Sequence, residues 1–287
     1  MVRVSPAIVH AGCKINLFLE IQNRRSDGYH MLHSLFYPLA EPHDELLIQP
    51  GRSGEGLVLS CSDSELEGPG NILYAAYAAF CRAAGVQPDL QVRLEKFIPM
   101  GAGLGGGSSD AAALLVFLNE NAGSPLGADQ LQTIALSLGA DVPFFLQGKP
   151  ALAGGIGEVL HPLEVDLTGT ELILICPGVH VSTADAYHAW DKLPPGKGRS
   201  LTRTYGMDKK PLCISEVVLF NDFEPAVFPL FPELRNLKLA MLRFGAAACV
   251  MSGSGAALVA LFREPQHSAP ARHWLESRKI SHFVHQF

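Results

Sequence analysis

The spacing of apolar and polar residues predicts many strands in the first third of the chain. Strands favour apolar residues in alternation or in short continuous runs, whereas helices repeat them every three to four residues. On this basis we expect strands over residues 2–9, 13–21, 30–37, 45–49 and 57–61. A helix over residues 71–84 follows a Gly-Pro-Gly stop, and a strand over residues 90–94 comes after it.

Helices alternate with strands through the remainder of the chain. Helices over residues 109–121 and 129–138 precede a hairpin over residues 151–165, whose turn is rich in glycine. The pattern then predicts strands over residues 171–176, 246–251 and 256–262, and helices over residues 183–190, 232–244 and 270–278. Residues 192–200 and 207–211 have the composition of linkers. Runs of strands with helices between them predict an α+β protein, and we expect two domains, residues 1–164 and 165–287.

A glycine-rich segment joins the strand over residues 90–94 to the helix over residues 109–121. Within it are five glycines, namely Gly101, Gly103, Gly105, Gly106 and Gly107, and Ser108 and Ser109 follow directly. Glycine reaches positive φ at little cost and lets a ligand approach bare backbone, although it makes a loop costly to order. Backbone N–H groups at a helix N-terminus bind phosphate well. The segment therefore predicts a nucleotide-binding loop.

Other interpretations of this loop fit less well. The spacing of Gly101, Gly103 and Gly106 satisfies a dinucleotide fingerprint, but that fold needs a strand after the helix, where a second helix is expected. A P-loop needs a lysine at the position of Gly107. An ordinary surface turn rarely needs more than one or two glycines.

Composition narrows the class of ligand. A chain of 287 residues with 48% hydrophobic content can form two domains with substantial cores. A net charge of −6 argues against nucleic acid as a partner, so the loop is expected to bind a small phosphorylated ligand. The six cysteines lack metal or disulfide spacing, and apolar runs are too short to span a membrane. We therefore expect a cytoplasmic protein with reduced thiols; the oligomeric state stays open.

The strand over residues 13–21 carries a candidate catalytic lysine. Alternation places Lys14 and Asn16 on one face, about 7 Å apart, together with Phe18 and Glu20. Asparagine is unfavourable in strands, which favours a site at this face. The alternative is an ordinary solvated sheet face.

Asp141 is a candidate catalytic carboxylate, because it lies among apolar residues in the segment from Leu138 to Phe145. Burial of a lone carboxylate is costly unless it is paired or functional, and Lys14 could supply the counter-charge. The alternative is that Asp141 caps a short helix that begins near Pro143.

Two turns are weaker candidates. Asp27-Gly28 predicts a turn that is followed by Tyr29 and His30. An aromatic ring beside an imidazole could hold a planar base, or could simply begin a buried strand. The small residues 252–255 predict a tight turn between two strands, which by itself says little about function.

Together these motifs resemble the GHMP kinases, in the same order and over nearly the whole chain. The resemblance rests on KINLFLEI, RRSDGYHMLHSLF, PMGAGLGGGSSDAAA, GADVPFF, NDFE and MSGSGA. The glycine loop is family-wide, whereas the K-x-N-L-F-L and D-G-Y-H elements resemble the branch that acts on a cytidine diphosphate derivative of methylerythritol, in the non-mevalonate route to isoprenoid precursors. The resemblance implies an N-terminal α/β nucleotide-binding domain and a C-terminal ferredoxin-like domain, with the active site between them.

The resemblance also implies ATP-dependent phosphoryl transfer to the 2-hydroxyl of the methylerythritol moiety. Asp141 matches the catalytic aspartate, which accepts the hydroxyl proton, and Lys14 matches the catalytic lysine, which stabilises charge on the attacking oxygen. The residues that match substrate-binding positions are Asn16, Tyr29, His30, Thr183 and Tyr187, with the ring of Tyr187 stacked on the cytosine. ATP-binding positions are matched by Asn71 and Lys96 near the adenosine and by the loop residues Pro99, Met100, Gly101, Ala102, Gly103, Leu104, Gly105, Gly106, Gly107, Ser108 and Ser109.

Mg²⁺ is expected as a cofactor, because it bridges the β- and γ-phosphates in phosphoryl transfer. Its protein ligand stays open: Ser108 and Ser109 are candidates, and the sequence shows no evident acidic ligand. The chain departs from the family in the approach to Lys14, where His10-Ala-Gly-Cys13 replaces a sequence like Ser-Pro-Ala.

Two alternatives remain. One is a kinase of this family with a different alcohol substrate, against which Tyr29, His30 and Tyr187 favour a cytidine. The other is a catalytically silent nucleotide-binding protein, against which the presence of both Lys14 and Asp141 argues.

Overall fold

The computed structural model describes residues 4–194, 212–214 and 217–287. It divides into two compact units that are discontinuous in sequence. The first unit contains Met1–Cys13, Pro38–Ile98 and Gly105–Gly148, and the second contains Lys14–Tyr37, Pro99–Leu104 and Lys149–Phe287. The boundary predicted after residue 164 concerns family domains, which these compact units do not measure, and it stays a prediction.

Two long strands contribute residues to both units. They are β1 (Ala7–Arg24) and β2 (His30–Pro50), which pair with each other. The prediction of separate strands over residues 2–9 and 13–21, and over residues 30–37 and 45–49, is therefore wrong, because β1 and β2 are each continuous. Gly12 does not end β1, because its lack of a side chain permits close pairing: a Cβ there would lie 2.5 Å from the carbonyl oxygen of Leu39. Pro38 and Pro42 do not end β2, since the fixed φ of proline is compatible with extended backbone.

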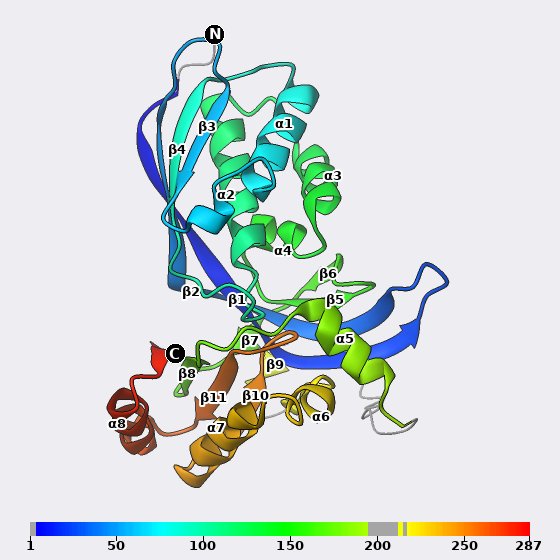
Figure 1. The fold of residues 1–287 in the computed structure, drawn as a ribbon, viewed down its shortest axis with the longest axis vertical. Helices are drawn as coiled ribbons and strands as arrows, with labels where there is room; N and C mark the ends of the chain where they lie inside the picture. Colours follow the sequence, from blue (N-terminus) through cyan, green and yellow to red (C-terminus); the bar gives the residue numbers. More distant parts are fainter. Residues whose placement is uncertain (1–3, 195–211, 215–216) are drawn as a thin grey trace. The chain divides into compact units, whose positions relative to one another are not determined.

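The first unit packs four helices against a sheet. Strand β4 (Leu90–Glu95) pairs parallel with β3 (Leu57–Cys61) and antiparallel with β2. The helices α1 (Ile72–Ala84), α2 (Gly106–Asn121), α3 (Ala128–Leu138) and α4 (Val142–Gln147) lie together beside β3 and β4 (Figure 1), and the short 3-10 helix η1 spans Ser64–Leu66. Buried residues such as Phe80, Val92 and Leu114 join helices and sheet in one core. The strand over residues 57–61 and all three helices predicted in this region are confirmed.

The second unit contains a four-stranded antiparallel sheet with the order β10-β11-β8-β12. Its strands are β8 (Glu171–Cys176), β10 (Ala248–Met251), β11 (Leu258–Phe262) and β12 (Ser281–Gln286). The helices α5 (Thr183–Asp191), α6 (Glu224–Val227) and α7 (Pro232–Arg243) separate β8 from β10, and the 3-10 helix η3 (Pro265–His267) and α8 (Ala269–Ser277) separate β11 from β12. This is the strand–helix–strand–strand–helix–strand order of a ferredoxin-like fold, as predicted.

Smaller elements complete the second unit. The predicted glycine hairpin is confirmed as β5 (Ala151–Gly154) and β6 (Val159–Pro162), and β5 pairs with β2. The short strands β7 (Val165–Asp166) and β9 (Leu212–Cys213) pair in parallel. Residues 195–211 lie outside the described part of the chain. Most of the linker predicted over residues 192–200, and all of the linker predicted over residues 207–211, therefore lie outside it too. No helix in the described part is both long and apolar enough to cross a membrane.

Candidate active site

The glycine loop adopts backbone conformations that require glycine. Gly101, Gly103 and Gly105 have φ values of 61°, 74° and 74°. Gly105 occupies the N-cap of α2, so the helix begins at Gly106, three residues earlier than predicted. Gly106 is helical, but a Cβ there would lie 3.1 Å from Cγ2 of Ile98 and 3.2 Å from Oδ2 of Asp44, which leaves little room for a side chain.

The turn over residues 252–255 packs directly on this loop within the second unit. A Cβ on Gly103 would lie 2.2 Å from the carbonyl oxygen of Ser252, and a Cβ on Gly253 would lie 3.1 Å from Cα of Gly103. The hydroxyl of Ser252 donates to the carbonyl oxygen of Gly103 over 3.2 Å. The backbone N–H of Ala257 donates to the carbonyl oxygen of Ala102 over 3.1 Å. The turn over residues 252–255, whose sequence alone indicated little about function, therefore holds the glycine loop in place.

The NDFE motif holds this turn in its place. The side-chain amide of Asn221 donates to the carbonyl oxygens of Met251 and Gly253, each over 2.7 Å. Glu224 accepts from the backbone N–H of Met251 over 3.0 Å. Asn221 and Ser252 were not predicted as site residues; their motifs were visible in the family resemblance, but nothing in their spacing assigned them a role.

Lys14 and Asn16 are buried on β1, so the predicted alternative of a solvated face is wrong. Residues 13–21 of this strand are buried on both faces. Nζ of Lys14 donates to Oδ1 of Asn16 over 2.9 Å and lies 4.5 Å from the ring centroid of Phe36. The backbone N–H of Lys14 donates to the carbonyl oxygen of Leu104 over 2.9 Å, and that of Asn16 donates to Ser252 over 3.1 Å. The lysine is thus fixed beside the glycine loop and its supporting turn.

His30 and Tyr187 form a stacked pair in the second unit. Their ring centroids are 5.0 Å apart with an interplanar angle of 8°. Nε2 of the buried His30 lies 2.9 Å from Oδ1 of Asp191, while Tyr29 is 61% exposed. Thr183, at the start of α5, lies within hydrogen-bond distance of Ser254, 2.9 Å between the hydroxyl oxygens. The structure therefore links Thr183 to the turn that supports the loop, and His30 to Tyr187 on the same helix as Thr183.

Asp141 belongs to the first unit, at the N-terminus of α4. It occupies the N-cap position, but its side chain makes no capping hydrogen bond, so the helix-cap alternative does not describe its carboxylate. Ser108 lies close to the chain just before Asp141, because a Cβ on Gly139 would be 3.9 Å from Oγ of Ser108. Ser109 is buried on α2.

Asn71 and Lys96 both have structural partners in the first unit. Asn71 caps α1, accepting from the N–H of Leu73 over 3.0 Å and donating to the carbonyl oxygen of Leu66 over 3.0 Å. Lys96 forms ion pairs with the buried carboxylates of Asp44 and Asp110.

The ion-paired group of Lys96, Asp44 and Asp110 fixes the chain where it enters the loop. Asp44 also accepts from the backbone N–H groups of Phe97 and Ile98, over 2.6 and 2.8 Å. Burial raises the pKa of Asp110 to about 7, although the ammonium of Lys96 opposes the rise. The two flanking carboxylates raise the pKa of Lys96 despite its burial, which by itself would lower it.

Comparison with known proteins decides the family. The family model "GHMP kinases N terminal domain" matches residues 71–149, and "GHMP kinases C terminal" matches residues 211–278. A protein of Nitratidesulfovibrio vulgaris (strain DP4), named 4-diphosphocytidyl-2-C-methyl-D-erythritol kinase, is 44% identical over 279 residues, covering 96% of this chain and 97% of its own. The chain belongs to the GHMP kinase family. A protein of the same name from Bacteroides thetaiotaomicron is 37% identical and covers 93% of this chain and 96% of its own.

Solved structures of GHMP kinases share the fold. A crystal structure of 4-(cytidine 5'-diphospho)-2C-methyl-D-erythritol kinase has a TM-score of 0.77 at 33% identity, covering 97% of this chain and 98% of its own. A homoserine kinase from Cytophaga hutchinsonii has a TM-score of 0.73 at 20% identity, covering 98% of this chain and 93% of its own. The second likeness shows the fold alone, because the fold is common to GHMP kinases that act on different alcohols.

Gly103→Ala should destabilise the protein, whereas Gly107→Ala should not. The first change puts a Cβ against the carbonyl oxygen of Ser252 at a positive φ, and overpacking alone costs about 1–3 kcal/mol. At Gly107 the nearest atom to a new Cβ is 4.0 Å away, and alanine favours the helix by up to about 1 kcal/mol. Urea unfolding of the two variants measures this difference. Equal stabilities would show that the contact between loop and turn is not tight.

Asp110→Asn should change how stability depends on pH. A carboxyl whose pKa is raised on folding contributes less stability as pH rises between its unfolded and folded pKa values, here from 3.8 to about 7. The asparagine variant has no carboxyl to titrate and so does not lose stability in this way. The difference between its free energy of unfolding and that of the parent should therefore shift in favour of the variant by roughly 1–3 kcal/mol from pH 5 to pH 8. Chemical unfolding at the two pH values measures it. Parallel profiles for parent and variant would contradict the assignment.

Proposed function

We propose that the protein phosphorylates the 2-hydroxyl of 4-(cytidine 5'-diphospho)-2-C-methyl-D-erythritol with ATP, in the non-mevalonate pathway to isoprenoid precursors. The observation that carries this proposal is the 44% identity, over 96% of the chain, to a kinase that is named for this substrate. The chain also contains, at matching positions, the family's lysine, aspartate and glycine loop. All six cysteines, each within the described residues, are outside any disulfide, which supports a cytoplasmic location.

ATP would bind through the backbone of the glycine loop. Gly101, Gly103 and Gly105 carry no side chains of their own beside their N–H groups, and α2 begins directly after them. A helix N-terminus with bare N–H groups favours phosphate through hydrogen bonds and the helix dipole. Asn71 and Lys96 belong to this proposal as residues that fix the start of α1 and the entry to the loop, near the adenosine position implied by the family.

Asp141 would act as the general base and Lys14 as the electrostatic partner of the reaction. Phosphoryl transfer depends mainly on alignment and charge neutralisation. Asp141 would accept the proton of the substrate hydroxyl as the phosphoryl group moves to that oxygen. The ammonium of Lys14, buried and held by Asn16, would stabilise negative charge on the attacking oxygen. The domain division at residues 164/165 belongs to the same proposal.

Mg²⁺ fits the side chains at the start of α2. The hydroxyl of Ser108 lies beside the turn that carries Asp141, and hydroxyl and carboxylate oxygens are hard ligands that suit this ion. Ser109 carries the other hydroxyl near the start of α2. When bound, Mg²⁺ would neutralise charge on the β- and γ-phosphates.

Recognition of cytosine would come from the second unit. Tyr187 would stack on the base, and Tyr29, exposed at the turn, is available to cover it. Nε2 of His30 is held by Asp191, so the imidazole is fixed in orientation and Nδ1 is the atom left to meet the base. Asn16 and Thr183 would contact the remainder of the substrate.

Asp141→Asn should lower kcat roughly 10²–10⁴-fold while substrate binding survives, because the amide cannot accept the proton. Asp129→Asn is the matched control, since Asp129 is an exposed aspartate in the first turn of α3, and it should keep the parental kcat. Steady-state kinetics and calorimetry measure the two effects. A kcat within a few-fold of the parent for Asp141→Asn would refute its role as base.

Tyr187→Ala should raise KM for the cytidine substrate and for its uridine analogue alike. Stacking is worth about 1–3 kcal/mol per base but does not depend on base identity. His30→Ala should instead reduce the preference for cytidine over uridine, because hydrogen bonds to base edges discriminate.

Tyr187→Phe retains the ring and serves as the control for stacking. Thermal unfolding of each variant tests whether the packing of His30 against Tyr187 and Trp190 has been lost. If His30→Ala folds and leaves the cytidine preference intact, His30 does not read the base.

A further inference from the structure

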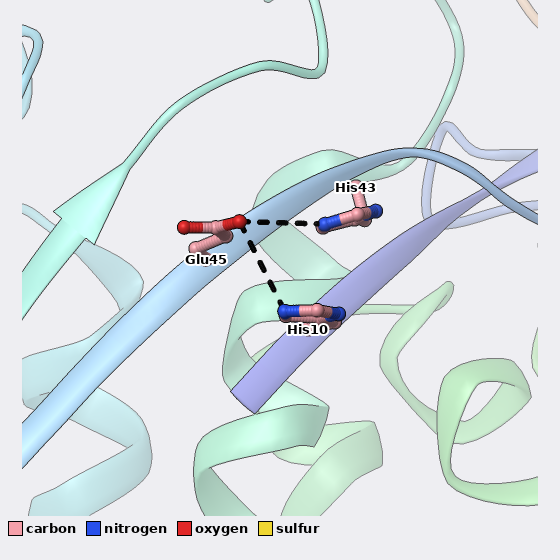
Figure 2. A group of neighbouring side chains, drawn as sticks. All are labelled: His10, His43 and Glu45. Atoms are coloured by element: carbon pink, nitrogen blue, oxygen red, sulfur yellow. Dashed lines mark ion pairs between the residues drawn. The ribbon is translucent and has the colours of Figure 1, made fainter. Parts of the chain in front are cut away.

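A second cluster of titratable side chains lies in the first unit, and the proposed reaction does not use it. Figure 2 shows its members, His10 on β1 and His43 and Glu45 on β2. One ligand atom from each residue lies within 4.8 Å of the others. Within residues 4–194, 212–214 and 217–287, this is the one group of three His, Cys, Asp or Glu side chains that meets this distance.

Strand geometry brings the three side chains to one point. His43 and Glu45 are two residues apart, so alternation places them on the same face of β2. Oε1 of Glu45 lies 3.9 Å from Nε2 of His10 and 3.6 Å from Nε2 of His43 (Figure 2). The two imidazole rings are stacked, with centroids 4.2 Å apart and an interplanar angle of 17°. Two nitrogens and one carboxylate oxygen therefore converge across the paired strands.

A further carboxylate fixes the orientation of His43. Nδ1 of His43 lies 3.1 Å from Oε1 of Glu41, within ion-pair distance. The other ring nitrogen, Nε2, faces Glu45. The same arrangement of carboxylate and imidazole supports histidine ligands in metal sites, where it fixes the tautomer and makes the ligand more basic.

We propose that His10, His43 and Glu45 bind a divalent transition-metal ion, with Zn²⁺ as the best match. Two neutral imidazoles and a carboxylate are a common zinc ligand set, with water in the fourth position. Ligands of a tetrahedral zinc ion lie about 2.0–2.2 Å from the metal, which places them roughly 3.4 Å from one another. The two separations from Glu45, 3.6 and 3.9 Å, are slightly longer than this, and the two imidazole nitrogens lie within 4.8 Å of each other.

The cluster can close around an ion at little cost. The side chain of His10 is 58% exposed, so it is free to turn out of the stack, whereas that of His43 is 19% exposed and already oriented. Mg²⁺ is a poor match, because it prefers oxygen ligands in octahedral geometry. Bound metal would tie β1 to β2 four residues before Lys14 and stabilise the folded protein by mass action.

The test uses the full chain, freed of metal with a chelator and then titrated with Zn²⁺ in the presence of Mg²⁺. We expect one Zn²⁺ per chain by calorimetry and a rise in unfolding temperature. His10→Gln and His43→Gln should weaken binding at least tenfold, and Glu41→Gln roughly 10–100-fold, because it removes the orienting carboxylate. His273→Gln, on the exposed surface of α8, is the matched control and should change nothing.

Cobalt spectra separate this site from the thiols. Co²⁺ should give d–d absorption without thiolate charge-transfer bands, and His43→Gln should abolish it. A variant that unfolds at a lower temperature than the parent when both are free of metal has been destabilised by the substitution itself. In that case the Co²⁺ spectrum of the parent protein still tests the proposal. Zn²⁺ affinity that is unchanged in folded His10→Gln and His43→Gln, thiolate bands with Co²⁺, or no binding at micromolar Zn²⁺ would each overturn the proposal; the cluster would then be a set of ordinary surface ion pairs.

Discussion

The close approach of two glycine turns is the constraint on which the arrangement of the site depends. Gly103 lies so near the carbonyl oxygen of Ser252 that a Cβ would be 2.2 Å from it. The same serine hydroxyl binds the carbonyl oxygen of Gly103 and accepts from the backbone N–H of Asn16. One residue therefore links the loop to the strand that carries Lys14. Asn221 holds the serine turn, so the NDFE motif acts on the loop through Ser252.

Buried polar groups are the second theme of the structure. Burial of charge is costly unless each group has partners, and the described contacts supply them for Lys14 and Lys96. Lys14 donates to Asn16 and lies over the ring of Phe36. Lys96 is shared between Asp44 and Asp110, which places two carboxylates around one ammonium. Burial raises the pKa of Asp110, Lys96 opposes the rise, and the neighbouring Asp44 adds to it. These groups fix the backbone on both sides of the loop.

Much of the fold follows from local pattern, and its exceptions have physical causes. The helices and the central strands were predictable, because their apolar residues repeat with the period of each element. The long strands β1 and β2 were divided wrongly, since Gly12, Pro38 and Pro42 look like breakers unless the neighbouring strand is known. The short strands β7 and β9 consist of two residues each, too few for a pattern.

The candidate site was predictable only in part. The glycine loop was predictable from the sequence, because five glycines in one segment have few structural uses. Lys14 and Asp141 were candidates from strand alternation and apolar surroundings alone, whereas Tyr187 and the role of His30 came from the family resemblance. Asn221, Ser252 and Asp191 act by supporting other residues, and such contacts between distant segments leave no local signal. The cluster of His10, His43 and Glu45 was invisible for the same reason, since its members come together only when β1 pairs with β2.

The proposed function depends most directly on the identity of the phosphoryl acceptor. The decisive measurement is coupled release of ADP by the purified protein with ATP and Mg²⁺, using 4-(cytidine 5'-diphospho)-2-C-methyl-D-erythritol beside mevalonate and homoserine as acceptors. We predict rapid ADP release with the cytidine diphosphate substrate and background release with the other two. Equal or faster release with mevalonate or homoserine, or none above background with the cytidine diphosphate substrate, would contradict the proposed function.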